Sequence, residues 1–276
     1  MPSIPQPHPM IVPQLLIIFL LASLPRIIYA FGMFKKSKDR FVEIDVLRGF
    51  AVIGMIIYHF FYIGNFYGFF EINFKTLPWL IFARFVQITF LTLVGVSMSI
   101  SKRRSRKFHS KQFKRAVVVF LFAMGITLVT YIFVPDRVIV FGILHLITVS
   151  ILVLSVLVDN KFLLLFFATF ALFYGLTIDE FSVPHSLILN IIGFSSEGYY
   201  ALDYFPIFPW ISGPLFGALL GGLIYKNGER RFGILPENFI VKGISWFGKN
   251  ALLIYVSHLV ILALFANAVV AILKFL

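Results

Sequence analysis

The sequence of 276 residues contains no cysteine, which excludes disulfide bonds, thiolate metal sites and cysteine nucleophiles. Charged residues are also scarce: they make up 13% of the chain, against about 25% in a typical soluble domain. Apolar side chains are abundant instead, because 60% of the residues are hydrophobic. This composition predicts an all-α, polytopic transmembrane helix bundle that forms a single domain over residues 1–276.

Negative charge is scarcer than positive charge, with 12 Asp and Glu against 24 Lys and Arg, so the net charge is +12. The basic residues gather in short segments between apolar runs, at 35–48, 102–115 and 226–249, and we therefore expect no nucleic-acid partner. The segments 69–77 and 179–203 are acidic or nearly neutral. Basic loops stay on the cytosolic side of a membrane. Eight spans with both termini extracytosolic place every basic segment on the cytosolic side and every acidic or neutral segment on the other.

Eight apolar runs are long enough to cross a hydrocarbon core of about 30 Å as helices. They cover Met10–Phe34, Leu47–Phe66, Pro78–Ile100, Ala116–Val134, Val138–Val158, Phe162–Ile178, Tyr204–Tyr225 and Asn250–Leu276. The first run is interrupted by prolines and forms an extra helix within residues 1–36, ahead of a core over residues 40–276. Ser186–Phe194 is apolar but too short to span. Gly213, Gly217 and Gly221 predict the close approach of a neighbouring helix.

The stretch Glu43–Asn65 carries charges at its start and one histidine in its apolar part. From Leu47 to His59 a helix rises about 18 Å, which places the imidazole near the middle of the bilayer. Arg48 and His59 are eleven residues apart, close to three helical turns, so they share one face. An ionisable residue at this depth usually marks a pathway or a reactive site.

Polar side chains on three other predicted helices are expected to join His59 in one water-filled cavity, because hydrocarbon offers them no partner. They are Arg84, Gln87, His145, Asn250, Ser257 and His258. Two of them have a simpler interpretation: His145 could hydrogen-bond across to another helix, and Arg84 could pair with an external acid such as Asp203. No carboxylate falls at mid-depth in the predicted spans, which argues against a Ser-His-Asp arrangement.

Two kinds of protein are compatible with these residues alone. A proton-coupled small-molecule transporter would use the histidines as an intramembrane relay, although the sequence shows no inverted repeat. A metal-binding membrane protein would use His59, His145 and His258, but no pair of ligands has i, i+4 spacing, and we expect no metal.

The run Arg40–His59 reads R-x-x-E-I-D-x-L-R-G-x-A-x-x-x-M-x-x-x-H. It resembles the start of the heparan-alpha-glucosaminide N-acetyltransferase catalytic domain family, which belongs with the transmembrane acyltransferases that acetylate glycans. The segments Phe141–Ser150, Tyr204–Gly222 and Trp246–Leu262 fit the same family in the same order. In the lysosomal branch the active-site histidine lies in the loop after this helix, where this chain has Phe69, Phe70 and Glu71. Here the histidine is on the helix, as in small prokaryotic members.

The resemblance implies a membrane-embedded acetyltransferase that moves an acetyl group from cytosolic acetyl-CoA to a glycan or amino-sugar-type acceptor on the extracytosolic side. His59 would act as a general base or as the nucleophile that carries the acetyl group. The catalytic candidates are His59, Arg84, Gln87, His145, Asn250 and His258.

Coenzyme A is anionic, and basic residues at the cytosolic mouth could meet its phosphates. The candidates for binding it are Asp45, Arg48, Lys102, Arg103, Arg104, Lys249 and Asn250. We expect the protein in the plasma membrane of a prokaryote, with acetyl-CoA, an extracytosolic saccharide or amine acceptor and membrane lipids as partners. A homodimer is compatible with the sequence.

Overall fold

The computed structural model describes residues 40–178, 182–183, 186–196, 203–230, 236 and 238–275. The span predicted over Met10–Phe34 lies outside these residues. The helices in the described part are α2 (Val42–Phe66), α3 (Leu77–Arg104), α4 (Phe108–Phe133), α5 (Ile143–Leu157), α6 (Lys161–Ile178), α7 (Leu187–Ile192), α8 (Ile207–Trp210), α9 (Ser212–Ile224), α10 (Phe239–Lys249) and α11 (Ala251–Phe275). Two 3-10 turns, η1 (Pro135–Arg137) and η2 (Lys226–Gly228), and a parallel pair of two-residue strands, β1 (Ser182–Val183) and β2 (Ser195–Ser196), complete it.

Six helical segments of the described residues are long and apolar enough to cross a membrane. They are Val42–Phe66, Leu77–Arg104, Phe108–Ile132, Lys161–Ile178, Ile207–Ile224 and Ala251–Leu273. The prediction of an all-α membrane bundle is thereby confirmed. The span predicted over Val138–Val158 is shorter than expected, because α5 begins only at Ile143 and has 15 residues. At about 1.5 Å per residue it reaches about 22 Å.

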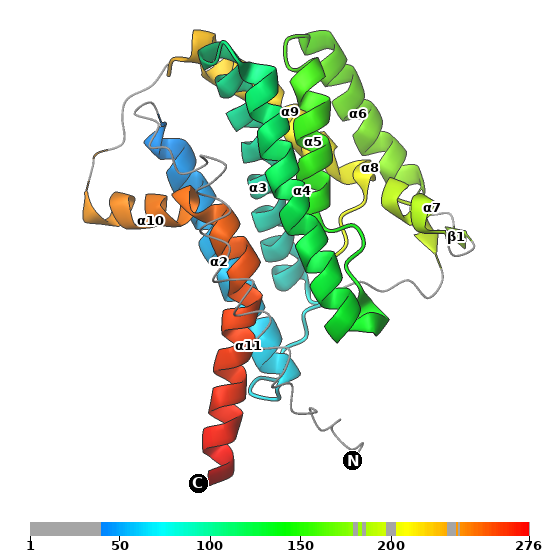
Figure 1. Cartoon of the computed structure of the whole chain (residues 1–276), viewed down its shortest axis with the longest axis vertical. Helices are drawn as coiled ribbons and strands as arrows, with labels where there is room; N and C mark the ends of the chain where they lie inside the picture. Colours follow the sequence, from blue (N-terminus) through cyan, green and yellow to red (C-terminus); the bar gives the residue numbers. More distant parts are fainter. Residues whose placement is uncertain are drawn as a thin grey trace.

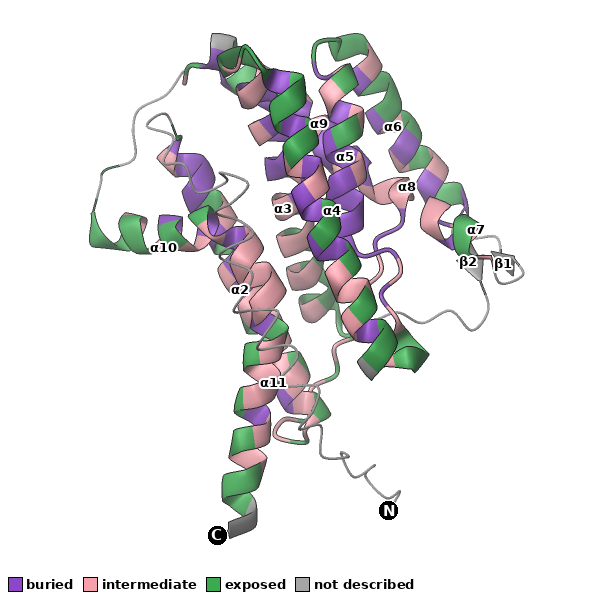
Figure 2. Cartoon of the chain, viewed as in Figure 1, coloured by how far each residue is buried: buried purple, intermediate pink, exposed green. Residues whose placement is uncertain are grey.

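The helices form two groups (Figure 1). Helices α3, α4, α5, α6 and α9 make a bundle, while α2 and α11 lie side by side along one flank of it and α10 crosses α2. Figure 2 shows that buried residues gather in the bundle, on the facing sides of α3, α4, α5 and α9. Its centre contains Met98, Leu146, Ile151 and Leu215, each at most 2% exposed.

Contacts between loops bring the basic segments to one end of the molecule. Lys102 at the end of α3 forms an ion pair with Asp159 after α5, at 2.7 Å. Arg104 donates to the carbonyl of Gly228, at 2.8 Å, and Arg230 lies 3.5 Å from the carboxylate of Glu43. The segments around residues 43, 102, 159 and 228 therefore share one end, as the predicted alternation of loops requires.

Glycines allow two pairs of helices to touch through their backbones. A Cβ added at Gly217 would meet the carbonyl of Thr92, and one added at Gly221 would meet Val96, so α9 lies directly on α3. This confirms the close approach predicted from the glycine spacing. A Cβ at Gly248 would meet the carbonyl of Asp45, which fixes the crossing of α10 over α2.

Helix α10 forms in a segment expected to be a loop. Asn238 caps it by accepting a hydrogen bond from the amide of Val241, at 2.8 Å. Ser245 and Gly248 are buried against α2, whereas Phe239 and Trp246 are 91% and 57% exposed. A short helix with apolar side chains on its outer face suits the boundary between lipid and water.

Candidate functional site

Two histidines meet between α2 and α11. The rings of His59 and His258 lie 4.8 Å apart between centroids, in an edge-to-face arrangement. His258 is 4% exposed, and its Nε2 is buried with no hydrogen-bond partner among the described residues. His59 is partly exposed. The structure therefore brings together two of the residues that were expected to share one cavity, and it leaves a buried ring nitrogen beside a partly exposed imidazole.

Backbone carbonyls fix which nitrogen of each ring is available. The Nδ1 of His59 lies 2.8 Å from the carbonyl of Met55, and the Nδ1 of His258 lies 2.6 Å from that of Tyr255. A carbonyl can only accept, so each Nδ1 carries the proton that it donates. In the neutral rings both Nε2 atoms then have a free lone pair, as a general base or a nucleophile requires.

A carboxylate reaches this pair through a tyrosine. Asp203, in the segment before α8, accepts at one oxygen from the Tyr255 hydroxyl at 2.9 Å and from the amide of Ile143 at 3.1 Å. The Tyr255 ring in turn lies 5.7 Å from that of His258. Asp203 lies outside the predicted spans, in the segment expected to be external, and its partner Tyr255 brings it close to His258. The carboxylate bonds to tyrosine rather than to histidine, and a Ser-His-Asp arrangement is not formed by these residues.

The surroundings of Asp203 shift the pKa of its carboxyl upward. Burial raises the pKa of this carboxyl, while the hydrogen bonds from Ile143 and Tyr255 act in the opposite direction. The contact with Tyr255 could not be predicted, because a single Asp in an aperiodic segment does not indicate a contact with a helix distant in the chain.

His145 lies apart from the pair. Its Nδ1 accepts from the amide of Gly142 at 3.2 Å, and its Nε2 lies 3.4 Å from the Thr127 hydroxyl, which itself donates to the carbonyl of Ile139. His145 thus closes the first turn of α5 and ties that helix to α4. This arrangement favours the simpler interpretation of His145, a hydrogen bond across to another helix.

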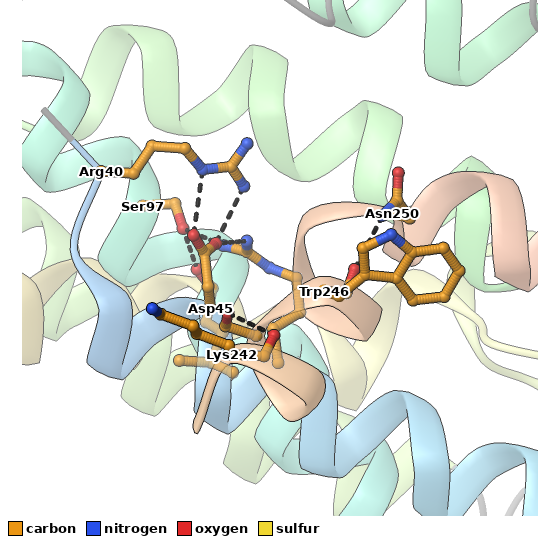
Figure 3. A network of polar contacts seen from close by, with 9 residues as sticks. Arg40, Asp45, Ser97, Lys242, Trp246 and Asn250 are labelled. Carbon is orange, nitrogen blue, oxygen red and sulfur yellow. Dashed lines mark hydrogen bonds and ion pairs between the residues drawn. The ribbon is translucent and has the colours of Figure 1, made fainter. Parts of the chain in front are cut away.

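Two arginines bind one carboxylate at the basic end, and Figure 3 shows the contact between Arg40 and Asp45. Asp45, whose side chain is 3% exposed, accepts from Arg40 at 2.8 and 3.0 Å and from Arg48 at 3.1 Å. Arg48 also donates to the Ser97 hydroxyl at 2.8 Å. Arg115 on α4 is close enough to Arg40 and Arg48 to be repelled by their charges. It has no ion pair within the described part of the chain. We call Arg40, Arg48 and Arg115 the arginine cluster. With Asp45 it retains a net positive charge that suits a phosphate.

The other predicted cofactor-binding residues do not join the arginine cluster. Lys102 is paired with Asp159, and the Arg104 guanidinium lies 4.2 Å from the ring centroid of Phe41. Arg103 and Lys249 are exposed. The Asn250 side chain donates to the carbonyl of Trp246 at 2.8 Å, which ties it to the end of α10. Of the predicted set, the structure brings Asp45 and Arg48 together. Arg40 and Arg115 were not singled out, although both lie within the basic segments.

Arg84 and Gln87 lie on a third part of the surface. Arg84 donates to the Gln87 side-chain oxygen at 3.2 Å, and its guanidinium lies 4.8 Å from the ring centroid of Trp210. An ion pair with Asp203, considered from the sequence, is not among the contacts of the described residues. In the same residues no three His, Asp or Glu side chains are grouped to hold a metal ion.

Residues 40–260 match the family model whose description is "Heparan-alpha-glucosaminide N-acetyltransferase, catalytic". The chain belongs to this family. The match contains α2 with His59, the Asp203 segment and the part of α11 that carries His258. Comparisons with curated proteins and with solved structures give no significant match.

Membership of the heparan-alpha-glucosaminide N-acetyltransferase catalytic family indicates a membrane acetyltransferase that acts on amino sugars. The apolar helices agree, since they make the chain an integral membrane protein.

Proposed function

We propose that the protein transfers an acetyl group from cytosolic acetyl-CoA to the amine of an amino-sugar acceptor that enters from the extracytosolic side. The observation that carries the proposal is the contact between His59 and His258, with both Nε2 atoms free of hydrogen bonds within the described residues. Two unprotonated nitrogens beside each other can serve one acyl transfer, since one can hold the acetyl group or the proton while the other assists.

The arginine cluster is the proposed site for the phosphates of acetyl-CoA. Arginine binds phosphate through two parallel hydrogen bonds, and Asp45 holds the forks of Arg40 and Arg48 in place. From Asp45 to His59 the helix rises about 21 Å. The pantetheine arm is long enough to carry the thioester over this depth toward the histidines.

In the direct reaction the acceptor amine attacks the thioester carbonyl, a C–N bond forms and the C–S bond breaks. His59 Nε2 takes the proton that the amine loses and returns it to the CoA thiolate. In the two-step reaction His59 Nε2 attacks first and expels CoA, and the amine then displaces the imidazole while His258 Nε2 takes its proton.

Replacing His59 tests this proposal. We expect His59→Ala to lower acetyl transfer to glucosamine by at least about 100-fold, the usual contribution of a general base or nucleophile. It should leave the stabilisation by CoA unchanged, because the arginine cluster lies about 21 Å away. Acetyl transfer is followed with radiolabelled acetyl-CoA and CoA binding by thermal unfolding in detergent.

The matched control is His109→Ala, since His109 is exposed at the start of α4. Wild-type turnover by His59→Ala would remove His59 from the chemistry. Absence of any stabilisation of the wild-type protein by CoA or acetyl-CoA would contradict the proposed donor.

A further inference from the structure

Helix α11 is the least buried of the membrane-spanning segments in the described part of the chain. Only 11% of its apolar window is buried, against 28–39% for the other five spans. In Figure 1 its C-terminal half (red) extends beyond the end of the bundle. The residues of α11 that pack against the core of the bundle, within the described part, are Leu252, Leu253, Tyr255 and Val256. The position of His258 therefore depends on how these first turns are held.

One hydrogen bond ties these turns to the bundle. The Tyr255 hydroxyl donates to Oδ2 of Asp203 at 2.9 Å. Among the described residues it is the only side-chain hydrogen bond that leads from α11 to another segment, since the others of this helix stay within it. The bond thus joins the pair formed by α2 and α11 to the segment that leads into α8 and α9.

Asp203 is itself held by the start of α5. The same Oδ2 accepts from the amide of Ile143 at 3.1 Å. A Cβ added at Gly142 would meet this oxygen, so the carboxylate rests directly against the backbone there. The amide of Phe205 donates to the carbonyl of Phe141 at 3.2 Å and joins the two segments a second time. The carboxylate is therefore a fixed point of the bundle.

Tyr255 connects this fixed point to the histidine pair. Its side chain is bonded to Asp203, and its backbone carbonyl accepts from Nδ1 of His258 at 2.6 Å. Tyr255 and His258 are three residues apart, so their side chains project from neighbouring positions on the helix surface. A rotation of α11 about its axis would therefore break the bond to Asp203 and turn His258 away from His59 at the same time.

We propose that Asp203 is a positioning residue for the acyl transfer: it holds the Tyr255 hydroxyl and thereby fixes the rotation of α11 at which His258 meets His59. The inference rests on the proposed transfer reaction. Asp203 bonds to neither imidazole within the described residues, so its effect reaches the reaction through Tyr255. The position needs an acceptor oxygen rather than a negative charge, because a neutral amide oxygen can also accept from an N–H and an O–H donor.

Tyr255→Phe tests the proposal, because it removes the hydroxyl and keeps the ring. We expect kcat to fall by at least about 10-fold, since a misplacement of reacting groups by about 1 Å can cost about 100-fold. The KM for acetyl-CoA should stay within about twofold, because Tyr255 makes no contact with the arginine cluster in the described structure. Asp203→Ala should lower kcat in the same way, whereas Asp203→Asn should keep it within about threefold of wild type.

Tyr204→Phe is the matched control, because Tyr204 lies in the same segment as Asp203 and its hydroxyl donates to the carbonyl of Asn190 at 2.6 Å. This variant also loses a tyrosine hydrogen bond, so it should lower the melting temperature and leave kcat per folded molecule unchanged. Equal kcat for Tyr204→Phe and Tyr255→Phe would overturn the inference. So would an Asp203→Asn variant as impaired as Asp203→Ala, which would indicate that the charge itself acts.

Chemical modification separates this inference from the proposed reaction. Diethyl pyrocarbonate acylates neutral imidazoles, and mass spectrometry of the peptides gives the rate at each histidine. His258 is 4% exposed and should react slowly in wild type, whereas in Tyr255→Phe its rate should rise several-fold relative to that of the exposed His109. Such a rise would support the positioning role even if the wild-type protein transferred no acetyl group. An unchanged rate at His258 would refute the positioning role and leave the proposed reaction intact.

Discussion

At the scale of single residues, the burial of Asp203 allows a prediction about the pH dependence of stability. Burial raises the pKa of this carboxyl in the folded protein. As the pH rises through the ordinary pKa of aspartate the unfolded chain loses its proton first, so the folded state loses stability until the pH exceeds the raised folded pKa. We therefore expect Asp203→Asn to gain stability relative to wild type as the pH rises from 4 to 8, measured by thermal unfolding in detergent.

Asp203→Ala is the companion variant. An asparagine keeps an oxygen that can accept from Ile143 and Tyr255, whereas alanine leaves both donors without their partner. We expect the alanine variant to be destabilised by about 1–3 kcal/mol at every pH. Equal pH profiles for wild type and Asp203→Asn would show that this carboxyl keeps its ordinary pKa.

The position of a site residue could be predicted from the sequence only where a single helix determines that position. The depth of His59 follows from its distance along the helix, because an apolar run with charges at its start fixes the level of every residue. The contact with His258 could not be read in this way, since it depends on where α11 begins relative to α2. Helix α10 crosses α2 at Gly248, and α11 then runs beside α2 so that His258 lies next to His59. Asp203 was missed because its partners come from distant segments.

At the scale of helices, the crossing of α10 over α2 should tolerate no side chain at Gly248. An added Cβ would meet the carbonyl of Asp45 and the amide of Gly49, and backbone atoms cannot yield as the end of a flexible side chain can. We expect Gly248→Ala to lower the free energy of unfolding by about 1–3 kcal/mol, as overpacking usually does. CoA should also stabilise this variant less, because Asp45 positions Arg40 and Arg48.

Gly243→Ala on the same helix is the control, since a Cβ there meets no atom within 4 Å. This variant should be neutral or slightly more stable, because alanine favours the helix by about 0.5–1 kcal/mol. If both variants unfold alike, the close contact at Gly248 is not needed for the fold.

The long helices agree with the sequence predictions because hydrophobic length is a strong signal in a membrane protein. The structure differs from the sequence predictions at two helices, α5 and α10. Helix α5 begins late because its first turn is closed by His145 and Asp203 rather than by a continuing helix. Helix α10 has only 11 residues, too few to span, so a search for spans passes over it.

At the scale of the whole molecule, the side of the membrane on which each end lies can be tested because the chain has no cysteine. A cysteine introduced by Asp136→Cys, in the turn after α4, should react with a membrane-impermeant maleimide added to intact cells. One introduced by His109→Cys, in the basic segment 102–115, should react only after permeabilisation. Both positions are exposed. The reverse labelling pattern would place the proposed acetyl-CoA site on the extracytosolic side and the acceptor on the cytosolic side.

The two carbonyls that hold the histidine rings have a consequence for any covalent product. Each occupies Nδ1, so an acetyl group, or an alkylating reagent that mimics it, can bond only to the far nitrogen of the imidazole. The adduct would be a single regioisomer, and both rings would present it on the side turned away from their own helix backbone. In the proposed reaction, these hydrogen bonds leave Nε2 as the reacting atom of each ring.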